Sequence, residues 1–143
     1  MTREQVDYVL FRASEARTAL DDARAIFEIG RVKPVVNRLY YACFHAASAV
    51  VCTTGASPKK HSSLLSAFGR DWVKTGRFPA QTAKLLRQLF DLRMQGDYGR
   101  AAMPTKEEVE RLIEQAQGFL DETLGYVEKY LEQDPATDCF RNT

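Results

Sequence analysis

The stretch Pro34-Val-Val-Asn-Arg-Leu-Tyr-Tyr-Ala-Cys-Phe-His-Ala-Ala-Ser-Ala-Val-Val-Cys52 decides the fold. It contains no glycine, and its one proline opens it, where a helix loses no backbone hydrogen bond. Positions 36, 40, 43, 47, 50 and 51 form one apolar stripe at helical spacing, and positions 39, 42, 46 and 49 form a second. A helix that is apolar on most of its sides belongs in the middle of a helical bundle.

The exceptions on this helix are four polar residues on one face. Arg38, Tyr41, His45 and Ser48 are spaced i, i+3, i+7 and i+10, which places them in one row along a helix. This row carries an arginine and one of the only two histidines in the chain. A buried helix with one polar row is the clearest indication of a functional site in this sequence.

Amphipathic patterns on either side of this stretch predict further helices. They cover about residues 2–29, 59–74 with an interruption at Gly69, 79–95 and 105–133. Gly30 and Gly96 are expected to end two of these helices, and Thr105 with Glu108 forms a capping-box pattern at the start of the last. No segment alternates as a strand does. We therefore expect an all-α, up-and-down antiparallel bundle of four to five helices over 1–133, followed by a loose tail over 134–143.

Composition places the chain among ordinary globular domains. Its 143 residues are 45% hydrophobic and 27% charged, enough for one domain with a real core. No apolar run reaches the roughly 18–20 residues that span a bilayer, and the N-terminus lacks an apolar signal core. The three cysteines form no CxxC pair, which argues against a disulfide framework. We expect a cytoplasmic protein with no membrane association.

The net charge of +1 conceals a polarity along the chain. Residues 1–58 hold seven Lys/Arg against six Asp/Glu (+1), residues 59–106 ten against three (+7), and residues 107–143 three against ten (−7). The middle segment could present a basic surface to an anionic partner such as RNA. Alternatively, the basic and acidic helices pair with one another within the fold or across a dimer.

Several kinds of site are excluded by the motifs that are missing. The sequence has no glycine-rich phosphate loop, no GxSxG, no HExxH, no paired cysteine ligands and no histidine three residues after a glutamate. We therefore expect no metal and no cofactor. What remains is a set of polar residues in apolar surroundings: Arg38, Tyr41, His45, Lys60, His61, Arg93, Asp97 and Tyr98.

These residues allow two interpretations. In the first, Arg93, Asp97 and Tyr98 form a structural network, because a buried arginine requires an acceptor and Asp97 is the obvious one. In the second, the guanidinium groups, Lys60 and an imidazole converge on a phosphate, which arginine binds bidentately while histidine moves a proton.

The same residues carry a resemblance to a known family. Asn37-Arg38-x-Tyr40-Tyr41-Ala42-x-Phe44, then Lys60-His61, then Leu92-Arg93-x-x-Gly96-Asp97-Tyr98 resembles, in that order, the small bacterial and archaeal HEPN-domain proteins. The resemblance spans about residues 5–132. It implies a helical bundle, usually a homodimer, with these polar residues around a cleft near the dimer interface.

The resemblance also implies a function. Many HEPN relatives are encoded beside a minimal nucleotidyltransferase as a toxin–antitoxin pair, and several HEPN groups are metal-independent ribonucleases. The ribonuclease groups place a histidine four to six residues after an arginine in a late helix. Here Asp97 and Tyr98 follow Arg93, and no histidine occurs after His61.

Two hypotheses about function follow from the resemblance. In the first, the chain binds or cleaves RNA or a nucleotide, with Arg93, His61 and Asp97 as catalytic candidates. Arg38, Lys60, Tyr41 and His45 then bind the anion, and Tyr98 is the hydroxyl that a nucleotidyltransferase partner modifies with AMP. The alternative is a non-catalytic homodimeric scaffold or nucleotide-sensing module.

Overall fold

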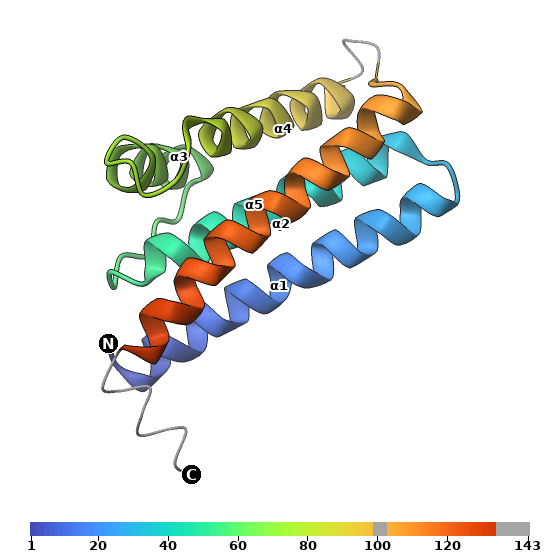
Figure 1. Cartoon of the computed structure of the whole chain (residues 1–143). Helices are drawn as coiled ribbons and strands as arrows, with labels where there is room; N and C mark the ends of the chain where they lie inside the picture. The colour runs from blue at the N-terminus through green and yellow to red at the C-terminus, as the bar shows by residue number, and fades with distance from the viewer. Residues whose placement is uncertain (99–102, 134–143) are drawn as a thin grey trace.

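The computed structural model describes residues 1–98 and 103–133, and within these ranges the secondary structure is entirely helical (Figure 1). This confirms the predicted all-α fold class. The elements are α1 (Arg3–Glu28), α2 (Val32–Cys52), α3 (His61–Phe68), a π-helical segment (Gly69–Val73), α4 (Ala80–Tyr98) and α5 (Lys106–Glu132). None of the described helices is long and apolar enough to cross a membrane.

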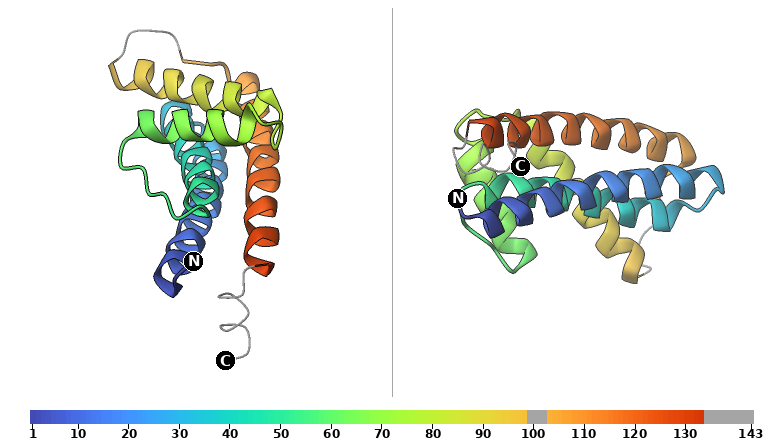
Figure 2. Two further views of the ribbon diagram at one scale, coloured as in Figure 1. Left: turned by 90° about the vertical axis from the view of Figure 1, so that its left-hand side faces the viewer. Right: turned by 90° about the horizontal axis from the view of Figure 1, so that it is seen from below.

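Three long helices lie alongside one another, and the other two cross them. α1 and α2 form an antiparallel hairpin, and α5 returns beside them in the direction of α2 (Figure 1). α3 and α4 run across this group, which Figure 2 shows from the side and from below. α2 contacts each of the other four α-helices, so the predicted central helix is indeed the centre of the bundle.

The core is built around α2. Its buried positions include Leu39, Tyr40, Val50 and Val51, each no more than 1% exposed. Fully burying a side chain of this size contributes about 1.5–3 kcal/mol before conformational entropy is subtracted. Both α1 and α2 also bury several alanines, and small side chains let two helices approach closely. The α1–α2 contact is accordingly the most extensive in the bundle.

The helix ends follow local rules that the sequence carries. At α5, the side chain of Thr105 accepts the N–H of Glu108 at 3.2 Å and that of Glu108 accepts the N–H of Thr105 at 3.4 Å, which confirms the predicted capping box. A second capping box, between Thr2 and Gln5, begins α1. Gly30 ends the α1 turn at φ +78°, the left-handed conformation expected there.

Three predicted boundaries differ from the structure. α4 continues through Gly96 to Tyr98 instead of ending near Gln95, because glycine in a helix costs only about 1 kcal/mol and does not by itself break it. α2 begins at Val32, so Pro34 is the third residue of its first turn. The helical backbone continues through Gly69, where α3 changes into a π-helical turn. In this turn Lys74 N donates to Gly69 O at 2.8 Å. The predicted tail over 134–143 lies outside the described residues.

Candidate functional site

Side chains from four helices meet beside one side of α2. They comprise five cationic or titratable residues around three aromatic rings, and we call this group the Arg–His cluster: Arg12 from α1, Arg38, Tyr40, Tyr41, Phe44 and His45 from α2, His61 from α3 and Arg93 from α4. Arg38, Tyr41, His45, His61 and Arg93 were predicted from the sequence, and the structure brings these five together.

His61 is the best-positioned titratable group of the cluster. It is the first residue of α3, and its ring stacks on Phe44 with 4.2 Å between the ring centroids. Its Nδ1 lies 2.7 Å from the hydroxyl oxygen of Tyr40. Burial, and then the charges of Arg93 and Arg12, lower the pKa of His61 below its ordinary 6.5. The imidazole is therefore neutral at pH 7, with one nitrogen that accepts a proton.

Tyr40 connects His61 to the core. Its ring is 0% exposed, whereas its hydroxyl reaches the half-buried imidazole. Burial chiefly raises the pKa of Tyr40 to about 12, with Arg93 acting in the opposite direction. The hydroxyl therefore keeps its proton near neutral pH, and it fixes one side of the His61 ring.

Arg93 of α4 lies over two rings of α2. Its guanidinium carbon is 5.4 Å from the centroid of Tyr40 and 5.1 Å from that of Tyr41. A cation over an aromatic face is attracted by about 0.5–2 kcal/mol, depending on how far the pair is removed from water. These contacts hold the positive charge of Arg93 within the cluster.

Arg12 and His45 connect α1 to α2. Arg12 Nη1 lies 2.8 Å from His45 Nδ1, and because a guanidinium can only donate, Nδ1 is the acceptor and the proton of His45 is on Nε2. Burial and then the Arg12 charge lower the pKa of His45. Arg12 also donates from Nε and Nη2 to the hydroxyl of Tyr8, at 3.0 and 2.8 Å.

Arg38 completes the polar row on α2. It donates from Nε and Nη2 to Oδ1 of Asn37, at 3.3 and 3.0 Å, and its guanidinium carbon lies 5.2 Å from the centroid of Tyr41. Tyr41 contacts His45 in turn, with ring centroids 6.1 Å apart. The acceptor of this arginine is therefore an amide. The fourth residue of the row, Ser48, is 4% exposed and buried in the helix packing.

The remaining predicted site residues are not part of the described cluster. Lys60 is exposed and is the N-cap residue of α3, immediately before His61. Asp97 and Tyr98 belong to the last turn of α4, but their side chains lie outside the described residues. The proposed catalytic role of Asp97 and the proposed modification of Tyr98 stay predictions.

The cluster is positively charged. Arg12 and Arg38 donate to neutral acceptors, whereas Arg17 and Arg24, further along α1, form ion pairs with Glu128 at 3.0 Å and Glu114 at 3.7 Å of α5. The arginines that face α5 are thus paired with carboxylates, whereas Arg12 and Arg38 use neutral acceptors and keep a positive charge that can attract an anion.

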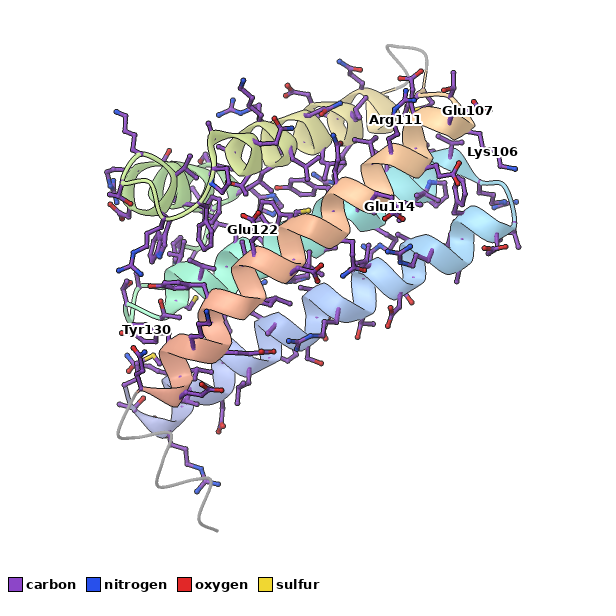
Figure 3. The ribbon with its side chains drawn as sticks, in the orientation of Figure 1. Lys106, Glu107, Arg111, Glu114, Glu122 and Tyr130 are labelled. Carbon is purple, nitrogen blue, oxygen red and sulfur yellow. The ribbon has the colours of Figure 1, made fainter. Side chains whose placement is uncertain are left out.

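The acidic segment lies elsewhere on the molecule. α5 carries eight Asp/Glu against three Lys/Arg, a net −5, and Figure 3 labels Glu107, Glu114 and Glu122 along it. The beginning of α3 and the end of α4 lie on the side of α2 away from α5 (Figure 2, right). The parts of α3 and α4 that supply His61 and Arg93 therefore lie away from the acidic helix, whereas Arg77 of the basic segment packs on Tyr126 of α5.

The described titratable side chains bear on the question of a metal site. Among the described side chains, those of residues 1–95 and 103–133, no three of His, Cys, Asp or Glu stand close enough together to hold a metal ion. Each of the two imidazoles has its Nδ1 directed to a protein group, Arg12 for His45 and Tyr40 for His61. The chemistry available is anion binding and proton transfer.

Sequence reasoning missed three members of the cluster, of which Tyr40 was expected only as part of the apolar stripe and the motif of α2. Phe44 was read only as part of a motif, yet its ring lies 4.2 Å from His61 and 5.9 Å from His45. Arg12 was not singled out, because an arginine on an amphipathic surface helix is ordinary and α1 carries several. The signal that was available is Tyr8, four residues before Arg12 and thus on the same face of α1.

Comparison with known proteins identifies the family. The HEPN domain model matches residues 9–129. The chain is 40% identical over 117 residues to a UPF0332 protein of Thermotoga maritima, covering 82% of this chain and 86% of that protein. It is 33% identical over 119 residues to a protein of Methanocaldococcus jannaschii named "Putative toxin MJ0605", covering 83% of this chain and 86% of that protein. This chain is a member of the HEPN domain family.

Proposed function

We propose that this HEPN protein binds RNA through the Arg–His cluster and cleaves it without a metal ion. The observation that carries the proposal is the convergence of three guanidinium groups and two neutral imidazoles from four helices. Arginine is the residue of choice for phosphate, and a neutral imidazole beside it is a ready proton acceptor.

The proposed chemistry requires only groups of the cluster and the RNA itself. His61 accepts the proton of a ribose 2′-hydroxyl, the 2′-oxygen bonds to the adjacent phosphorus, and the bond from phosphorus to the 5′-oxygen breaks. Water supplies the proton to the departing 5′-oxygen, which leaves a 2′,3′-cyclic phosphate and a 5′-hydroxyl. Arg93 and Arg12 stabilise the charge that builds on the phosphoryl oxygens in the transition state.

We also propose that the protein is the toxin-like member of a two-component pair. The support is the name of the M. jannaschii relative and the HEPN family itself. The expected partner is a minimal nucleotidyltransferase, and a homodimer remains our expectation for this chain. Mass spectrometry of the protein isolated with such a partner tests AMP transfer to Tyr98, through a peptide mass increased by one AMP moiety.

The decisive experiment is RNA cleavage in the presence of EDTA by the wild type, Arg93→Gln and His61→Gln. The matched control is Arg87→Gln, because Arg87 is an exposed arginine on the same helix. We expect cleavage by the wild type and Arg87→Gln, and loss of at least about a hundredfold in the other two, as is typical of removed acid–base groups. Circular dichroism establishes that each variant is folded.

A second candidate function is favoured by a specific observation. Arg12 of α1 and Arg93 of α4 lie against aromatic side chains of α2, so they also tie these helices to α2. In a non-catalytic scaffold or nucleotide sensor this would be their whole role. In that case, RNA stays intact in EDTA with the wild type and with every variant, and Arg93→Gln lowers only the free energy of unfolding.

A further inference from the structure

A groove outside the Arg–His cluster lies between the beginning of α1 and the loop after α2. It has a volume of about 410 Å³ and is lined by Glu4, Gln5, Tyr8, Cys52 and residues 55–57. This volume lies in the range of small-ligand sites in proteins. Its lining combines an aromatic ring with hydrogen-bonding groups, which is the combination that an unpaired nucleobase requires.

The groove is continuous with the cluster through Tyr8. The hydroxyl of Tyr8 accepts two hydrogen bonds from Arg12, at 3.0 and 2.8 Å, and Arg12 donates its third to His45. Cys52, on the other side of the groove, is also close enough for the Arg12 charge to act on its pKa, which burial raises. A ligand with its phosphate at Arg12 therefore has the groove beside it.

Two exposed aromatic side chains border this region. Tyr8 is 37% and Phe11 55% exposed, and their ring centroids lie 6.5 Å apart. Exposed rings next to a cationic group are the standard elements of single-strand recognition, because a base stacks on the ring while the cation holds the backbone.

The remaining lining favours a base over a second phosphate. Glu4 would repel a phosphate, but its carboxylate can accept an N–H from a base. The Oε1 atom of Gln5 accepts the N–H of Thr2 at 2.8 Å, which directs its Nε2 toward Gly55. A carboxylate acceptor and an amide donor thus lie at the groove, beside the ring of Tyr8.

We propose that this groove is a subsite for one unpaired base of single-stranded RNA, stacked on Tyr8, whose neighbouring phosphate lies at Arg12. The subsite rests on the proposed function and specifies its substrate class. Double-stranded RNA is excluded from it, because its bases are already stacked and paired.

The test compares two ligands that differ only in their bases. One is a short single-stranded adenosine RNA with 2′-O-methyl riboses, which blocks cleavage, and the other is the same backbone with abasic positions. The dissociation constants are measured for the wild type, Tyr8→Phe and Tyr8→Leu. For the wild type we expect the strand with bases to bind at least about fivefold more tightly, as one base–aromatic stack provides.

The variants locate the stacking. Tyr8→Phe keeps the ring and is expected to keep this preference, whereas Tyr8→Leu keeps the apolar bulk without the ring and is expected to lose it. Leu10→Ala is the matched control, because Leu10 is an exposed apolar residue of α1 (50%) outside the groove.

The possible failures are distinguishable. Equal affinity of the wild type for both strands, or an unchanged preference in Tyr8→Leu, overturns the subsite and leaves RNA binding by the cluster intact. A change of oligomeric mass in Tyr8→Leu with the preference unaltered makes this surface a protein contact and also overturns the subsite. Failure of the wild type to bind either strand overturns the subsite together with the proposed function.

Discussion

Replacing Tyr40 with phenylalanine removes one oxygen atom from the centre of the Arg–His cluster and leaves the buried ring in place. The atom that is lost lies 2.7 Å from Nδ1 of His61. A hydrogen bond of this kind contributes about 0.5–1.5 kcal/mol net to stability. Because His61 is only half-buried, water can replace the hydroxyl, and we expect the lower half of that range.

The expected effect of Tyr40→Phe on RNA cleavage follows from the free energy of this hydrogen bond. If the hydroxyl orients His61 for proton transfer, the loss of about 1 kcal/mol lowers the cleavage rate by about fivefold. The free energy of unfolding from urea titration, followed by circular dichroism, should fall by at most about 1 kcal/mol, and Tm by about 3–5 °C. Tyr126→Phe is the control, since Tyr126 is a half-buried tyrosine of α5 that packs against Phe78.

Two results would refute this reasoning. Destabilisation by more than about 3 kcal/mol would mean that the hydroxyl is a buried partner that water cannot replace. An unchanged cleavage rate in Tyr40→Phe, together with loss of cleavage in His61→Gln, would mean that Tyr40 does not position the imidazole.

Three further predictions concern pH, salt and helix capping. Folding lowers the pKa of His45, so the unfolded state binds more protons, and the free energy of unfolding should decrease as the pH falls below about 6.5. In urea titrations, the free energy of unfolding should decrease less between pH 7.5 and pH 5.5 for His45→Asn, which keeps an acceptor for Arg12, than for the wild type. An equal decrease in both proteins would show that His45 is not the group responsible. If the three arginines of the cluster each bind a phosphate, the logarithm of RNA affinity should fall against the logarithm of salt concentration with a slope of about −2 for a single strand, measured by filter binding; a slope near zero would rule out phosphate contacts. Thr105→Ala removes the α5 cap and should cost about 1 kcal/mol in thermal unfolding without changing RNA cleavage, and a stability equal to that of the wild type would show that the cap contributes nothing.

The fold could be predicted from the sequence because local signals agree with the tertiary structure. The α5 helix begins at its capping box, and α2, which carries two apolar stripes, is the central helix. Gly96 shows the limit, since α4 continues through it to Tyr98 although glycine lowers helix propensity.

Members of the Arg–His cluster could be predicted where burial makes a polar side chain costly, and Arg12 was missed because its helix face is partly exposed. Arg38 and His45 stand out because they interrupt an apolar helix. Arg12 lies at the edge of an amphipathic helix, where an arginine is ordinary, and only the docking of α2 against α1 gives it His45 as a partner. Local pattern cannot encode a contact between residues that are 33 positions apart.

The extensive contact between α1 and α2 has a consequence for the order of folding. These helices are consecutive and joined by a three-residue turn, so their contacts close early, as is general for short-range contacts. During synthesis this hairpin emerges before α3 and α4. A partly made chain can thus hold Arg12 against His45, but it acquires His61 and then Arg93 only later. The cluster is completed by the last crossing helix, and an incompletely folded chain should have no phosphate chemistry.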